Sequence, residues 1–147
     1  MIKSSELLRY SLFDGLEKEQ IDSILSLMEF EAFEADTDIV EEGSSNSKIH
    51  FILDGFVMVI KDGVKLMGLG EGGVFGEMEV LEILPVEATI RTVTATKVMT
   101  LSIDALGEIF ETDLKTYSFI LMNLARDIAR RFRLLNTRVV NESSDET

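Results

Sequence analysis

The middle of the chain, residues 33–103, most constrains the fold because it consists of short apolar and β-branched runs separated by tight turns. Asp-Gly pairs interrupt these runs at 54–55 and 62–63. Asp-Gly between such runs is a hairpin signal, because a type I′ turn needs positive φ at both central residues. Two further runs, 88–95 and 97–103, follow with one residue between them. The pattern predicts a sandwich or small barrel rather than a parallel sheet.

Helical periodicity lies on both sides of this region. Residues 18–30 place Ile21, Ile24, Leu25 and Met28 at helical spacing. After Asp104 a longer apolar stripe runs at steps of three and four, formed by Leu114, Tyr117, Leu121, Leu124, Ile128, Phe132 and Leu135. We therefore predict a mainly β domain with flanking helices.

The predicted organisation is one domain over residues 1–140. Its parts are a β-roll at about 33–103 and a C-terminal helix at about 113–136. The polar residues 141–147 are expected to form a flexible tail.

Composition excludes several classes of protein. A chain of 147 residues with 46% hydrophobic and 28% charged residues fits one soluble globular domain. It has no cysteine, which excludes disulfides, thiolate metal sites and cysteine nucleophiles. No apolar run approaches the roughly 20 residues that span a bilayer, and residues 1–20 lack the apolar core of a signal peptide. We expect a cytoplasmic protein that does not bind membranes.

The acidic charge is unevenly distributed. The net charge is −13, and residues 1–112 hold 8 Lys and Arg against 22 Asp and Glu. Basic residues gather in 113–135, on the predicted C-terminal helix. Because most of the surface would repel nucleic acid, we interpret this helix as solvated rather than as a nucleic-acid site.

Six fragments in order carry a family resemblance: "LFDGL", "IVEEG", "HFILDGFVMVIKDG", "LGEGGVFGEMEVLE", "PVEATIRT" and "LARDIARRFR". Together with the order of predicted elements, they resemble the cyclic nucleotide-binding domain family, which includes catabolite activator proteins, kinase regulatory subunits and cyclic-nucleotide-gated channels. The resemblance covers nearly the whole chain. It implies a jelly-roll-like β-roll, or double-stranded β-helix, with N-terminal helices, a short helix starting near Gly76 and a long C-terminal helix.

The resemblance also implies where a ligand would bind. The cassette positions are Gly76, Glu77, Met78, Val86, Glu87, Ala88 and Thr89. Family members bind the ribose with the glycine and glutamate found here as Gly76 and Glu77. The N–H groups at the start of the short helix could face an anion. For Glu77 alone, an acidic residue in a first helical turn would be favourable without any ligand.

The second half of the cassette departs from the family pattern. Pro85 and Ala88 match, but Val86 stands where the family has its phosphate-binding arginine, and Glu87 stands where a small, often hydroxyl-bearing residue is usual. Losing one partner of a buried charged pair typically costs about 2–5 kcal/mol. We therefore expect weak or altered binding of cAMP and cGMP. Arg91 could compensate, but we interpret it as a structural ion-pair partner.

The C-terminal helix suggests a second role. The resemblance implies a homodimer through Tyr117, Leu121, Leu124, Ile128 and Phe132, although this stripe could instead pack on its own β-roll. Leu135 and Asn136 are the candidates for capping a ligand base.

An enzyme is the least favoured reading. The single histidine, His50, cannot form a histidine metal cluster, and no nucleophile elbow or calcium-ligand spacing is present. We expect no metal and no cofactor, with a cyclic nucleotide as a doubtful ligand. The chain carries no helix-turn-helix domain after the helix, so we expect a stand-alone module with an unknown output partner. The leading hypothesis is a regulatory ligand-sensing module. The alternative is a ligand-free dimerisation or interaction module.

Overall fold

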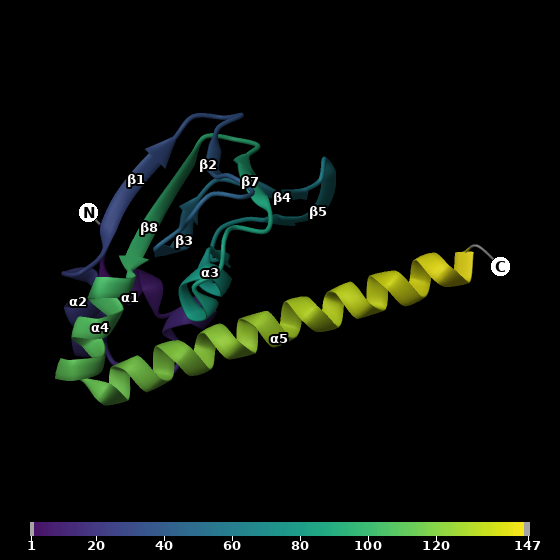
Figure 1. The fold of residues 1–147 in the computed structure, drawn as a ribbon. Coiled ribbons are helices and arrows are strands. Elements are labelled where there is room, and N and C mark those ends of the chain that lie inside the picture. Colours follow the sequence, from purple (N-terminus) through teal and green to yellow (C-terminus); the bar gives the residue numbers. More distant parts are fainter. Residues whose placement is uncertain (1, 146–147) are drawn as a thin grey trace.

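The computed structural model describes residues 2–145 and contains two four-stranded antiparallel sheets that form a β-roll (Figure 1). The strand order is β1-β8-β3-β6 in one sheet and β2-β7-β4-β5 in the other. This confirms the predicted fold class. The strands are β1 (Glu29–Phe33), β2 (Asp38–Val40), β3 (Lys48–Asp54), β4 (Val57–Lys61), β5 (Val64–Leu69), β6 (Val74–Phe75), β7 (Thr89–Thr92) and β8 (Thr96–Ser102).

One of the two predicted Asp-Gly hairpins is present. Asp62 and Gly63 have φ of 50° and 76° and join β4 to β5, with Lys61 opposite Val64, as a type I′ turn requires. The hairpin predicted at Asp54-Gly55 is wrong. Here the chain crosses from one sheet to the other, because β3 pairs with β6 and β8 while β4 pairs with β5 and β7.

Two apolar clusters hold the domain together. One lies between the sheets and contains Val40, Ile52, Val57, Phe75, Val86, Ile90 and Val98. The other joins the helices to the first sheet and includes Leu7, Phe13, Ile21, Phe51, Met99, Ile109, Ile120 and Leu124. The side chains of Phe51 and Leu124 are almost completely buried there.

The N-terminal helices are shorter than the sequence predicts. They are α1 (Ser4–Leu7), a 3₁₀ turn η1 (Ser11–Phe13) and α2 (Lys18–Leu25). The predicted helix over 18–30 ends early because residues 29–33 pair with β8, beginning with Glu29 opposite Thr100. Met28 is buried in the core but lies outside the helix.

Two helices follow the roll, α4 (Ile103–Thr112) and α5 (Leu114–Asp145). Asp113 separates them and accepts hydrogen bonds from the amide and hydroxyl of Thr116, at 3.1 and 2.5 Å. The buried Asn123 donates to the carbonyl oxygens of Leu12 and Asp14, which fixes α5 against η1. Figure 1 shows α5 passing under the roll and projecting beyond it.

The C-terminal helix is longer than predicted. It continues past residue 136 through residues 141–145, which the sequence analysis placed in a flexible tail, and residues 146–147 lie outside the described part of the chain. Arg138 forms an ion pair with Glu142, four residues later, and pairs at this spacing favour a continued helix. Whether this segment is flexible stays a prediction. Among residues 2–145, no helix combines the length and apolar character that crossing a membrane requires.

Candidate functional site

The short helix α3 (Glu77–Glu82) begins where the sequence predicts. Gly76 precedes it with φ of 82°, a conformation that disfavours residues with a Cβ. A Cβ at Gly76 would also lie 2.6 Å from Asn46 Nδ2 and 2.7 Å from the carbonyl oxygen of Lys48. Position 76 is therefore restricted to glycine by both backbone conformation and packing.

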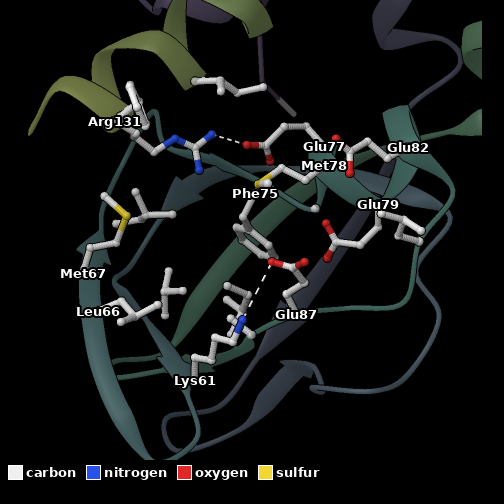
Figure 2. A pocket seen from close by; sticks show the side chains of 18 of the residues that line it. Lys61, Leu66, Met67, Phe75, Glu77, Met78, Glu79, Glu82, Glu87 and Arg131 are labelled. Atoms are coloured by element: carbon white, nitrogen blue, oxygen red, sulfur yellow. Dashed lines mark hydrogen bonds and ion pairs between the residues drawn. The ribbon is translucent and has the colours of Figure 1, made fainter. Parts of the chain in front are cut away.

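Glu77 is the buried charge of the site, with 1% of its surface exposed. Arg131 of α5 donates a hydrogen bond to its Oε1 and a second, at 2.8 Å, to Asp127 Oδ2 (Figure 2). Burial raises the pKa of Glu77, and the Arg131 guanidinium opposes that rise. Arg131 Nε is buried without a hydrogen-bond partner in the described structure. We call Glu77, Asp127 and Arg131 the α3–α5 ion cluster.

A cavity of about 360 Å³ lies between α3, α5, the β4–β5 hairpin and the segment before β7. Its size falls within the usual range of small-molecule sites. The apolar lining comes mainly from the roll and includes Val59, Leu66, Met67, Leu69, Phe75 and Ile90. Gly76, Glu77 and Met78 line the side formed by α3, as the resemblance implies.

The other predicted cassette residues are only partly brought to the cavity. Glu87 and Ala88 line it. Val86 does not: its side chain is 3% exposed and packs between the sheets, while its backbone pairs with Ser44 and Gly43. Thr89 does not line the cavity either, and its hydroxyl accepts a hydrogen bond from the backbone amide of Glu42.

Within residues 2–145, both cationic side chains that line the cavity have an acidic neighbour. Lys61 Nζ lies 3.9 Å from Glu87 Oε2, and Arg131 belongs to the α3–α5 ion cluster. Arg91 forms a 2.7 Å ion pair with Asp38 and does not line the cavity, which agrees with its predicted structural role.

The functional residues predicted on the C-terminal helix lie mainly in two different places, the cavity lining and the monomer core. Ile128, Phe132 and Leu135 line the cavity, whereas Asn136 does not. Leu124 is 1% exposed within the monomer core, so its assignment to a dimer surface is wrong. Tyr117 and Leu121 also pack on that core, Tyr117 with its ring edge against Phe110.

Sequence reasoning missed Arg131 and the hairpin wall. The spacing of Asp127 and Arg131, four residues apart on a helix, was the one signal for their pairing. No sequence signal places Lys61, Leu66 or Met67 at the cavity, because that depends on how the β4–β5 hairpin is placed relative to α3. In the described residues, no group of three or more potential metal ligands comes together.

The β-roll, the helix α3 that begins after Gly76, and the cavity between α3 and α5 are features that the family resemblance implies. A family model described as the cyclic nucleotide-binding domain matches residues 30–113. The chain belongs to the cyclic nucleotide-binding domain family.

Curated relatives include a potassium/sodium hyperpolarization-activated cyclic nucleotide-gated channel 2 from Mus musculus and the corresponding channel 4 from Homo sapiens. Each is 32% identical over 100 residues, or 68% of this chain. The match covers only 12% and 8% of the two channels, so this chain spans a small part of their length.

Solved structures of cyclic nucleotide-binding domains and related proteins also resemble this fold. A cyclic nucleotide-binding domain from Methylobacillus flagellatus has a TM-score of 0.89 at 26% identity, covering 95% of this chain and 83% of that one. Thermus thermophilus catabolite activator protein has a TM-score of 0.76 at 25% identity, covering 90% and 63%. The regulatory domain of Toxoplasma gondii PKA, crystallised with cAMP, has a TM-score of 0.64 at 25% identity, covering 72% and 42%.

Proposed function

We propose that this chain is a regulatory ligand-sensing module, in which occupancy of the cavity changes the position or mobility of α5. The observation that carries the proposal is that one cavity is lined by both α3 and α5, which the α3–α5 ion cluster joins directly. A ligand bound there would contact Glu77 and Arg131 together. It would therefore alter the same contacts that hold α5 against the roll.

The proposed module binds cAMP and cGMP weakly. The family's phosphate-binding arginine is replaced by Val86, which is packed in the core. In the part of the chain that the structure describes, the two cations that line the cavity, Lys61 and Arg131, each have a carboxylate partner, and Arg91 pairs with Asp38 outside the lining. The short helix α3 offers little compensation, since Glu77 and Glu79 already place negative charge in its first turn. A cytoplasmic location and a lack of catalysis stay predictions.

A thermal-shift screen with cAMP, cGMP and cyclic dinucleotides tests ligand sensing, because a ligand at 100 times its Kd adds about 2.7 kcal/mol of stability. Hydrogen exchange then tests coupling for any compound that stabilises the protein. The expected result is altered amide exchange in residues 132–145 as well as in the cavity wall. Protection confined to the roll, with exchange along α5 unchanged, would contradict a sensing role for this helix.

We further propose that the module forms a homodimer through α5. The supporting observation is an apolar stripe along α5 that continues beyond the cavity, including Phe132 at 66% exposure and Val139 at 60%. With Leu121, Ala125, Ile128 and Leu135, these positions follow a seven-residue repeat typical of paired helices. This stripe keeps Leu121, Ile128 and Phe132 of the predicted dimer face and leaves out Leu124, which is buried in the monomer.

Light scattering on Val139→Glu tests the dimer. Val139 lies outside the cavity lining, so the variant places charge in the stripe without changing the ligand site. We expect a dimeric wild type at tens of micromolar, roughly the range in which modest interfaces assemble, and a monomeric variant. Val93→Glu is the matched control, because Val93 is also an exposed valine, at 49%, but lies between β7 and β8. A monomeric wild type would leave the alternative of another protein partner.

A further inference from the structure

We propose that the cavity takes a ligand with a cationic head, such as a protonated amine, on an apolar body. This inference rests on the proposed function, because it concerns the same cavity. It differs from the family's anionic cyclic nucleotides. Its basis is a mostly apolar cavity whose unpaired charges are negative.

The charge balance of the cavity wall is the first argument. Four carboxylates line the cavity, those of Glu77, Glu79, Glu82 and Glu87, against the two cations Lys61 and Arg131. Arg131 is engaged by Glu77 and Asp127, and Lys61 by Glu87. Among the described residues, neither Glu79 nor Glu82 has a side-chain ion pair with a cation. An anion entering the cavity would meet no free cation, whereas a cation would meet free carboxylates.

The arrangement of Glu79 and Glu87 is the second argument. The two residues come from different segments, α3 and the chain before β7, and Figure 2 shows their carboxylates approaching the same space beside Phe75. Burial raises the pKa of Glu79, and the negative charge of Glu87 adds to that rise. Like charges held together at a partly buried wall repel each other. The contact of Lys61 with Glu87 is long, at 3.9 Å, and both side chains are exposed, so a cation between the two carboxylates would still reduce this repulsion, while a phosphate would increase it.

The apolar residues of the cavity define the rest of the ligand. Val59, Leu69, Phe75 and Ile90 form an apolar floor, and Phe132 and Leu135 of α5 contribute further apolar surface. With a volume of about 360 Å³, the cavity has room for a small organic molecule. Such walls favour an apolar body by removing it from water. Their low polarity also strengthens the attraction between an amine head and Glu79.

Three probes of one shape separate charge from size: 3-phenylpropylamine, 3-phenylpropanol and 3-phenylpropionate, which carry a positive, a neutral and a negative head. Isothermal titration calorimetry should show saturable binding of one amine per chain. We expect affinity to fall from amine to alcohol to carboxylate, with at least about a tenfold difference between the charged probes. Glu79→Gln should reduce the preference for the amine several-fold. Glu108→Gln, which removes an exposed charge on α4 outside the cavity, is the matched control and should leave it unchanged.

The outcomes separate this inference from the proposed function. Equal or tighter binding of the carboxylate would overturn the inference. Weak, unsaturable amine binding that both Gln variants reduce equally would show only attraction to an acidic surface, and would also overturn it. Saturable binding of a cyclic nucleotide without amine binding would overturn the inference but retain ligand sensing. Binding of neither class, in the screen or by calorimetry, would count against both.

Discussion

Arg131 near the middle of α5 bonds to Glu77 at the start of α3, although the two residues are 54 positions apart in the sequence. This contact joins the helix that follows the roll to the helix that forms the cavity wall. The Arg131 side chain is 19% exposed and the Glu77 side chain only 2%. Removing one partner therefore leaves a buried charge rather than a solvated one.

We expect Arg131→Met to destabilise the fold by about 2–4 kcal/mol, because it leaves Glu77 buried without its cation. Chemical denaturation measures this change. Arg133→Met, on the exposed side of the same helix, should change stability by less than about 0.5 kcal/mol. The double variant Glu77→Gln, Arg131→Met should recover part of the loss. Equal effects of the two Arg variants would contradict a structural role for the pair.

Gly76→Ala should destabilise the protein by more than the strain of a positive φ alone. The matched control is Gly43→Ala, because Gly43 has φ of 84° but no atom within 4 Å of a Cβ. We expect about 1 kcal/mol for Gly43→Ala and at least about 1–2 kcal/mol more for Gly76→Ala, where Asn46 and the Lys48 carbonyl must move. Thermal denaturation compares the two variants. Similar losses would mean that the packing around Gly76 adjusts freely.

His50 should make the fold sensitive to mild acid. It is 4% exposed, stacks on Phe75 with ring centroids 4.6 Å apart, and its pKa is lowered to about 4, mainly by burial. The nearby charges of Glu31 and Lys48 oppose each other in this shift. Because the unfolded chain takes up the proton more readily, the contribution of neutral His50 is present above about pH 6.5 and is lost as the pH falls toward 4.

The difference in unfolding free energy between pH 7.5 and pH 5 measures this effect. His50→Phe keeps a ring of similar shape without a titrating group, so it should lose about 2 kcal/mol less than the wild type over this interval. The carboxylates titrate in both proteins and cancel in the comparison. The same pH dependence in both proteins would show that His50 is not the source.

The sequence predicts those parts of the site whose structure depends on neighbouring residues. The family resemblance locates Gly76 and Glu77, and the glycine turn and helix start there depend on neighbouring residues. Asp62-Gly63 forms its hairpin for the same local reason. Val86 and Leu124 were placed wrongly because their orientation depends on distant partners. Val86 is turned into the core by pairing with Gly43 and Ser44.

Long-range contacts also explain the remaining omissions. Asp54-Gly55 has the composition of a hairpin, but the strands on either side find their partners in different sheets. From the sequence, Arg131 is interpreted as one of several solvated arginines. It is partly buried because it bonds to Glu77, which is distant in the sequence. Helical periodicity alone could not decide which side of α5 faces the roll, because apolar residues occur on both sides.

Calorimetric titration of cAMP tests most directly the claim that the cavity has lost its phosphate-binding cation. The account predicts a Kd of about 1 mM or weaker for the wild type. Glu87→Arg places a cation on the cavity wall and should bind cAMP at least about tenfold more tightly, with a smaller gain for Glu87→Gln, which only removes the opposing charge. Micromolar binding by the wild type would contradict the account, since Arg131 or another paired cation would then have to bind the phosphate.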